Sequence, residues 1–239
     1  DTAQILGSAG NDNFYTNESY TYLRGNDGSF LNYLKDFNEI SVDVSGDAGI
    51  DTAYMYDGAN DDILIAGEAQ ATLDYSSNIL PGVNITATGF DRVDAYGQNG
   101  GTDQATLNGS SGDDTFTGLT TYAYLTGNGG AYVNYVKGFD NVTADVSGTT
   151  GSDTAKLFDG AGDDDLQAGE TQVVLDFDAT GASDPNLTAV GFPDVSVYAL
   201  NGGDDTALMT GSAGNDRFTG RETYGRMKGD DGAFINYAK

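Results

Sequence analysis

Five short phrases of the sequence combine glycine with aspartate or asparagine, residue types that suit the binding of hard cations. They are "GSAGND" at 7–12, "DGANDD" at 57–62, "GSSGDD" at 109–114, "DGAGDD" at 159–164 and "GSAGND" at 211–216. Glycine lets the backbone adopt positive φ, and the short acidic and amide side chains present oxygen atoms. Calcium accepts about six to eight such oxygens in irregular geometry, whereas magnesium requires a stricter octahedron. We therefore expect Ca²⁺ as the bound ion.

The aspartates within and at the ends of these phrases are the candidate metal ligands. Two carboxylates in contact repel each other by about 1 kcal/mol even in water, so adjacent aspartates that converge favour a cation between them. The alternative is that glycine, asparagine and aspartate simply form good turns without an ion. The candidate ligands are Asp12, Asp57, Asp61, Asp62, Asp113, Asp114, Asp159, Asp163, Asp164 and Asp216.

The acidic phrases belong to a tandem repeat, because the same words return after 109 − 7 = 102 and 211 − 109 = 102 residues. Each copy divides into two related halves of about 51 residues, and both halves begin with Asp-x-Ala. Extra residues in the second half, around "YSSNILPG" and "ATGASDPN", are predicted to be loop insertions. We expect a fragment of a longer array with one copy at 1–102 (halves 1–50 and 51–102), one at 103–204 (halves 103–152 and 153–204) and a partial copy at 205–239.

The apolar residues predict short β-strands. "FDNVTADV" at 139–146 alternates, which places Phe139, Val142, Ala144 and Val146 on one face of a strand. No stretch has the helical spacing of apolar residues. Five or six strands in each half fit two coils of a right-handed parallel β-solenoid, or β-helix, in an all-β chain. The alternative is a series of tandem β-sandwich domains, although such domains seldom show a half-length repeat.

The acidic phrases resemble the glycine- and aspartate-rich nonapeptide of the RTX (repeats-in-toxin) proteins, GGxGxDxUx with U a large apolar residue. "GSAGNDNFY" at 7–15 fits with Ser8 in place of the second glycine, and "GSSGDDTFT" and "GSAGNDRFT" fit equally well. The resemblance implies a secreted bacterial protein whose calcium-bound turns support a parallel β-roll. Here one nonapeptide occurs in about 51 residues, a spacing more like that of the long repeats of large bacterial surface proteins.

Composition excludes several classes of function. Acidic residues number 37 and basic residues 10, so the net charge of −27 disfavours nucleic acid as a partner, and no apolar run predicts direct membrane insertion. Aspartate supplies 32 of the 37 acids, which favours turns and ligands over a solvated helix face; adaptation to salt is the competing explanation. Cysteine and histidine are absent, which removes thiolate catalysis and the commonest general base. Because the polar features repeat, whereas an active site normally occurs once, we do not expect an enzyme.

Two further columns of residues recur at the 102-residue spacing. Lys35, Lys137 and Lys239 are in register, and they predict either a line of cations that faces aspartates or simple protection of a strand edge. Tyr33 and its equivalents at 135 and 237 form a row of tyrosines. Such rows can stack against sugars, pack fibres side by side, or form half-buried ladders.

These patterns together predict a structural component of an extracellular fibre, surface layer or matrix. It is expected to be secreted or at the cell surface, to be stabilised by calcium, and to associate with other copies of itself or with flanking repeats through stacked β-repeats. A carbohydrate-binding adhesin module, with a polysaccharide as its partner, is the alternative. A polysaccharide lyase or hydrolase is the least favoured hypothesis.

Overall fold

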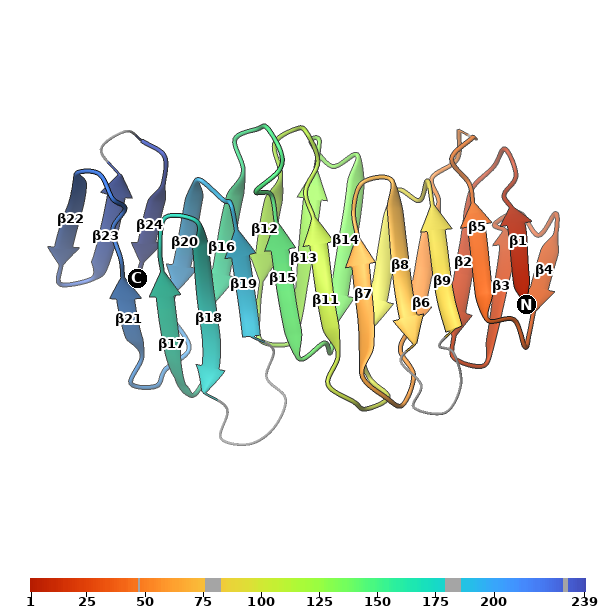
Figure 1. Ribbon diagram of the computed structural model, residues 1–239, viewed down its shortest axis with the longest axis horizontal. Helices are drawn as coiled ribbons and strands as arrows, with labels where there is room; N and C mark the ends of the chain where they lie inside the picture. The colour runs from red at the N-terminus through yellow and green to blue at the C-terminus, as the bar shows by residue number, and fades with distance from the viewer. Residues whose placement is uncertain (47, 76–82, 179–185, 230–231) are drawn as a thin grey trace. The chain divides into compact units, whose positions relative to one another are not determined.

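A computed structural model describes residues 1–239 except 47, 76–82, 179–185 and 230–231 (Figure 1). The described residues form strands β1 to β24 and contain no helix, so the prediction of an all-β chain is confirmed. Most of the two predicted loop insertions lies outside the described residues. In the described part of the chain, no helix has the length and apolarity needed to cross a membrane.

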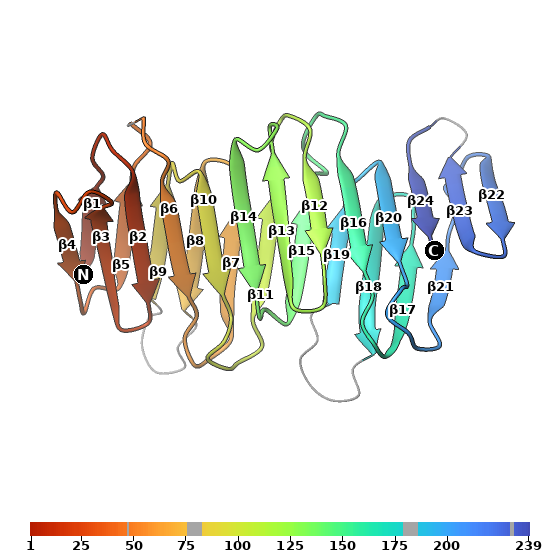
Figure 2. The same ribbon diagram turned by 180° about the vertical axis from the view of Figure 1, so that it is seen from behind.

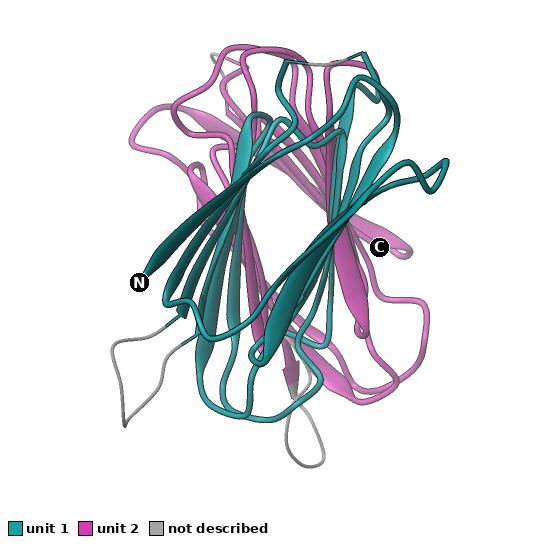
Figure 3. Ribbon diagram, turned by 90° about the vertical axis from the view of Figure 1, so that its right-hand side faces the viewer, with its two compact units in different colours: residues 1–108, 130–139 teal, residues 109–129, 140–239 magenta. Residues whose placement is uncertain are grey.

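The chain divides into two compact units, unit 1 (Asp1–Asn108 with Gly130–Phe139) and unit 2 (Gly109–Gly129 with Asp140–Lys239), which Figure 3 shows in teal and magenta. Each unit contains strands of two sheets, named here sheet A and sheet B. In unit 1, sheet A has the order β1 (Thr2–Leu6), β5 (Glu39–Asp43), β9 (Val83–Thr88), β8 (Gln70–Tyr75), β7 (Asp62–Ala66) and β11 (Gln104–Asn108). Sheet B has the order β4 (Leu31–Leu34), β3 (Tyr20–Gly25), β2 (Asp12–Asn17), β6 (Thr52–Tyr56), β10 (Arg92–Tyr96) and β14 (Tyr132–Lys137).

Unit 2 is built in the same way. Its sheet A strands follow the order β15 (Asn141–Asp145), β19 (Asn186–Val190), β18 (Gln172–Asp178), β17 (Asp163–Ala168) and β21 (Thr206–Met209). Its sheet B strands follow the order β22 (Asp216–Arg221), β23 (Tyr224–Gly229), β24 (Ile235–Ala238), β20 (Asp194–Tyr198), β16 (Thr154–Phe158), β12 (Thr115–Gly118) and β13 (Tyr122–Gly127).

The path of the chain through unit 1 explains the half-length repeat. From β1 in sheet A the chain crosses to sheet B for β2, β3 and β4, and it returns to sheet A as β5, which pairs in parallel with β1 (Figures 1 and 2). The next half begins in sheet B with β6, passes through β7, β8 and β9 in sheet A, and returns to sheet B as β10, parallel to β6. Successive halves therefore exchange the roles of the two sheets.

The fold is a β-solenoid of about five turns, as the sequence predicts. The prediction of two coils in each half is wrong, because each half visits one sheet, then the other and then the first again, as β1, β2–β4 and β5 do, and so makes fewer than two circuits. Three of the five strands in a half form an antiparallel meander inside one sheet, as β2, β3 and β4 do, and so they do not advance the winding. The period-two pattern that predicts the strands is the same for a meander and for a parallel coil, so sequence alone does not separate them.

The core lies between the two sheets of each unit and consists of alternate side chains. Phe139, Val142, Ala144 and Val146 are all buried, which confirms the face predicted for that strand. The large apolar residue of the first two nonapeptides, Phe14 or Phe116, also points inward. Phe14 and Phe116 have no exposed surface, and their rings lie 5.8 Å from that of Phe90 and 6.2 Å from that of Phe192 respectively.

Candidate metal sites in the acidic turns

Each acidic phrase forms a turn that the carboxylate of its last aspartate closes. The backbone N–H of Ser8 donates to Asp12 Oδ2 at 2.6 Å, and that of Ser110 donates to Asp114 Oδ2 at 2.7 Å. The backbone N–H groups of Gly58 and Gly160 donate in the same way to Asp62 and Asp164. All four aspartates are buried, so these bonds satisfy polar groups that would otherwise be costly inside the protein.

Four of the turns are also bonded to the first aspartate of the next half. The backbone N–H of Asp12 donates to Asp51 Oδ1 at 2.6 Å, and that of Asp114 donates to Asp153 Oδ1 at 2.8 Å. Asp103 and Asp205 accept the equivalent bonds, at 2.8 and 3.0 Å from the N–H of the aspartate that closes the turn. The Asp-x-Ala opening of each half is therefore the partner of the preceding turn. This aspartate recurs in the sequence at the start of each half, but it is not among the predicted ligands.

The adjacent aspartate pairs point apart. Asp61, Asp113 and Asp163 are exposed, whereas the residue after each of them is buried. Their carboxylates accept backbone N–H groups across the turn, as Asp61 Oδ1 does from Thr102 at 2.8 Å. The equivalent donors to Asp113 and Asp163 are Ser152 and Asp204, also at 2.8 Å. These exposed aspartates therefore fasten one half to the next, and the structure does not bring the two members of a pair onto one ion.

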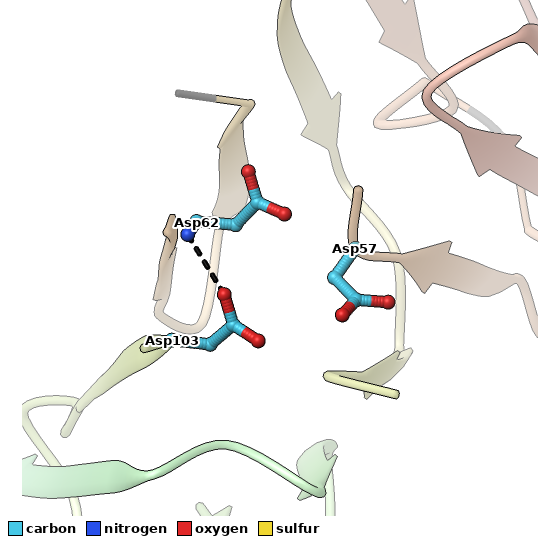
Figure 4. A group of neighbouring side chains, drawn as sticks. All are labelled: Asp57, Asp62 and Asp103. Carbon is cyan, nitrogen blue, oxygen red and sulfur yellow. Dashed lines mark hydrogen bonds between the residues drawn. The ribbon is translucent and has the colours of Figure 1, made fainter. Parts of the chain in front are cut away.

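Two turns, at 57–62 and 159–164, differ from the others and are called here the aspartate turns. In the first, ligand atoms of Asp57, Asp62 and Asp103 lie within 4.8 Å of one another and all three residues are buried (Figure 4). Asp159, Asp164 and Asp205 form the equivalent group, in which Asp205 is exposed. The structure thus joins two predicted aspartates of each turn with a third that was not predicted.

An asparagine holds the first aspartate of each aspartate turn. The backbone N–H of Asn99 donates to Asp57 Oδ2 at 2.7 Å, and its side-chain amide donates to Asp57 Oδ1 at 2.8 Å. Asn201 makes the same contacts with Asp159. The loop that carries Asn99 comes close because Gly101, at φ +105°, has no Cβ; a Cβ there would overlap the carbonyl group of Asn60.

The turns at 7–12, 109–114 and 211–216 are called here the serine turns. Glycine stands in the position of Asp57, and a serine hydroxyl donates to the closing aspartate at 3.0 Å from Ser8, Ser110 and Ser212. Among the described residues, the predicted ligands Asp12, Asp114 and Asp216 belong to no group of three acidic side chains. Asp216 is half-buried, unlike Asp12 and Asp114.

The aspartate turns have the chemistry of a site for a hard cation. Carboxylate oxygens suit magnesium, calcium and manganese, and thiolate and imidazole ligands are absent from the chain. Unit charges 4.8 Å apart repel by about 0.9 kcal/mol in water and by more where water is excluded. A carboxylate has about four lone-pair sites, so an oxygen that accepts one N–H can also bind an ion. These buried clusters can therefore hold a metal ion.

Charge accumulates in the serine turns as well, but to a smaller extent. Burial raises the pKa of Asp153, the charge of Asp114 raises it further, and the hydrogen bond from the Asp114 backbone opposes the shift. Two carboxylates meet in this turn where three meet in an aspartate turn. In the serine turn, hydrogen bonds from Ser110 to Asp114 and from the Asp114 backbone to Asp153 thus stabilise the two carboxylates.

Comparisons with protein-family models, with characterised proteins and with solved structures find no match for this chain. The class of this protein is therefore described from the arrangement of its own strands and turns. It is a tandem-repeat β-solenoid in which alternate acidic turns carry clusters of three carboxylates.

Proposed function

We propose that the chain is a calcium-stabilised structural segment of an extracellular fibre, surface layer or matrix, and that it assembles by stacking β-repeats on neighbouring repeats or copies. The proposal assigns it no catalysis. The observation that carries it is a difference between equivalent phenylalanines: Phe14 and Phe116 are fully buried, whereas Phe218 is 59% exposed.

The partner ring accounts for this difference. Phe14 contacts Phe90 and Phe116 contacts Phe192, and both partners stand 76 positions later in the sequence. Phe218 instead lines an open cavity of about 630 Å³ in unit 2, together with Leu208, which is 63% exposed. Burying two such side chains contributes about 3–6 kcal/mol to an association, which favours a neighbouring repeat as the cover.

Calcium is the ion that the proposal assigns to the aspartate turns. Their ligands come from two successive halves, as Asp62 and Asp103 do, so an ion would fasten one half to the next. Calcium tolerates irregular oxygen geometry, which supports this ion over magnesium in the aspartate turns. At the millimolar calcium of extracellular fluids even a weak site is filled, which fits a secreted location.

Sedimentation velocity at rising protein concentration, in 2 mM calcium or in EDTA, tests the proposal. We expect concentration-dependent assembly in calcium and much weaker assembly of Phe218→Lys. Ile50→Lys is the matched control, because Ile50 is also exposed, at 69%, but does not line the cavity. A chain that stays monomeric in calcium at every concentration, or a Phe218→Lys variant that assembles like the control, would overturn the stacking role.

A further inference from the structure

The outer face of sheet B in unit 1 carries a continuous ladder of tyrosines, called here the tyrosine face. Tyr15 lies 5.1 Å from Tyr22 and 4.9 Å from Tyr56, measured between ring centroids, and Tyr56 lies 4.9 Å from Tyr96. Tyr33 joins the ladder through Tyr20, and Tyr135 joins it through Tyr96. The strands of this sheet in unit 1 lie in the order β4, β3, β2, β6, β10 and β14 (Figure 2), and the sequence places a tyrosine of the ladder in every one of them.

The basic residues share this sheet. In unit 1 the basic residues are Arg24, Lys35, Arg92 and Lys137, and each lies in a sheet B strand or directly after one. Arg92 pairs with Asp94 at 2.8 Å, while Arg24, Lys35 and Lys137 are exposed. Among the described sheet A strands, none of either unit contains a lysine or an arginine. The tyrosine face is therefore locally cationic on a chain whose net charge is −27.

The outer face of sheet A in unit 1 has the opposite character and is called here the isoleucine face. Ile63 and Ile65 on β7 are 43% and 46% exposed. Asp74 stands beside Ile63 on the neighbouring strand, and Glu39 stands two strands further along the same row, beyond Asn84. The isoleucine face thus has an exposed apolar centre with acidic neighbours, and the tyrosine face has an aromatic centre with basic neighbours. The two faces are complementary in charge.

We infer that the tyrosine face of one copy packs on the isoleucine face of a second copy of this chain. This lateral contact goes beyond the stacking role, since it uses neither the acidic turns nor Phe218. It joins two different surfaces, so the pairing is heterologous and open, and each added copy presents a new face to the next. Repeated association of this kind builds layers or bundles.

The geometry of the rings favours a protein surface over a sugar as the occupant. Tyr15 and Tyr22 lie nearly parallel, at 6° and 5.1 Å, and Tyr56 and Tyr96 are inclined by 16° at 4.9 Å. At these separations the ring faces cover each other and are not presented to a flat pyranose. The edges and hydroxyl groups that remain suit close packing with aliphatic side chains and hydrogen bonds to carboxylates.

The area of the contact sets its strength. Six strands about 4.8 Å apart and about five residues long, at about 3.3 Å for each residue, give a face of roughly 500 Å² on each copy. That total of about 1,000 Å² is at the lower end of specific interfaces, so the association is weak and depends on concentration. Neighbouring charges of opposite sign fix its orientation more than its affinity.

A charge exchange between the two faces tests the pairing. One variant reverses the tyrosine face with Arg24→Glu and Lys137→Glu, a second reverses the isoleucine face with Glu39→Lys and Asp74→Lys, and a third carries all four changes. The third variant keeps the net charge of −27, so a general change of charge does not explain its behaviour. Association is measured by sedimentation equilibrium in Phe218→Lys chains, which removes the contribution of end stacking.

We expect each single-face variant to associate about tenfold more weakly and the four-change variant to return to within about threefold of the parent. Glu170→Lys, in an exposed turn, is the control and leaves association unchanged. Failure of the four-change variant to recover overturns the pairing and leaves the stacking role intact. A parent that stays monomeric but binds polygalacturonate through Arg24 and Lys137 overturns it in favour of a glycan.

Discussion

The aspartate and serine turns share one backbone and differ in what fills a single position. The N–H of Asp57 donates to the carbonyl of Tyr96 in an aspartate turn, and the N–H of Gly7 donates to the equivalent carbonyl of Asp43 in a serine turn, both at 2.9 Å. The residue after that carbonyl is Gly97 in the first case and Val44 in the second. In the aspartate turn the larger side chain of this contact is that of Asp57, opposite a glycine. In the serine turn it is that of Val44, opposite Gly7.

This exchange decides which turn can collect a third carboxylate. A Cβ at Gly7 would stand 2.6 Å from Val44 Cγ1, so the valine that fills the serine turn also excludes an aspartate there. Gly109 and Val146 repeat the arrangement in unit 2. The serine turns are therefore closed by packing against a valine and by a serine hydroxyl. The aspartate turns lack that valine contact and hold a third carboxylate in its place.

The largest effect is expected when the closing aspartate of a serine turn is removed. Asp114→Ala leaves the backbone N–H and the hydroxyl of Ser110 without their acceptor in a buried site, and we expect a loss of about 3 kcal/mol in the free energy of unfolding. The loss is the same in calcium and in EDTA when urea unfolding is followed by circular dichroism. A loss that appears only in calcium would place an ion in the serine turn.

The next effect concerns the aspartate turn and depends on the ion. Asp57→Gly removes one of three carboxylates, so the stabilisation that calcium gives through this turn disappears. That stabilisation is about 2.7 kcal/mol at a calcium concentration 100 times the dissociation constant. In EDTA the removal of two repulsive contacts offsets the loss of the hydrogen bonds from Asn99, so the same variant costs less stability there than in calcium. A cost that is the same in calcium and in EDTA, measured by thermal or urea unfolding, refutes the assignment.

A smaller effect separates the two turns through the serine. Ser110→Ala removes the hydrogen bond of 3.0 Å to Asp114 and the acceptor of the Gly112 N–H at 3.3 Å, and it is expected to cost about 1 kcal/mol, whether or not calcium is present. Ser111→Ala, at the neighbouring exposed position, is the control. Equal stability of the Ser110→Ala and Ser111→Ala variants would show that the Ser110 hydroxyl does not stabilise the serine turn.

The smallest effect is on the pH dependence of stability. Burial and then the charge of Asp114 raise the pKa of Asp153, so the folded state holds this proton more tightly than the unfolded state. The associated stability is present at low pH and is lost as the pH rises through the raised pKa. Asp153→Asn is therefore more stable than the parent at neutral pH, and the difference shrinks in acid. An equal difference at pH 3 and pH 7 in urea unfolding would contradict this.

The solenoid is predictable from the sequence because the period-two alternation marks the buried face of each strand and the repeat shows that the same strands recur along the chain. The buried positions of Val142 and Ala144 follow directly from that alternation. The meanders are not predictable in this way, since β3 has the same apolar spacing as a parallel strand. Asp103 was missed because it stands 41 residues after Asp62, and only the winding of the chain brings the two together.

The prediction that adjacent aspartates converge on one cation fails for a different reason, because residues close in sequence are here separated in space. Asp61 and Asp62 are neighbours in sequence, yet they lie on opposite sides of a strand start, one exposed and one buried. In an extended backbone successive side chains point to opposite faces, so adjacency works against a shared ion. The spacing of five residues from Asp57 to Asp62, bridged by a turn, is the better indicator of a cluster.

Equilibrium dialysis with radioactive calcium tests the central difference between the turns most directly. The account predicts about two ions for each chain, one in each aspartate turn, with about one ion lost in Asp57→Gly and none lost in Ser110→Ala. A chain that binds no calcium, or an Asp57→Gly variant that still binds as many ions as the parent, would contradict it.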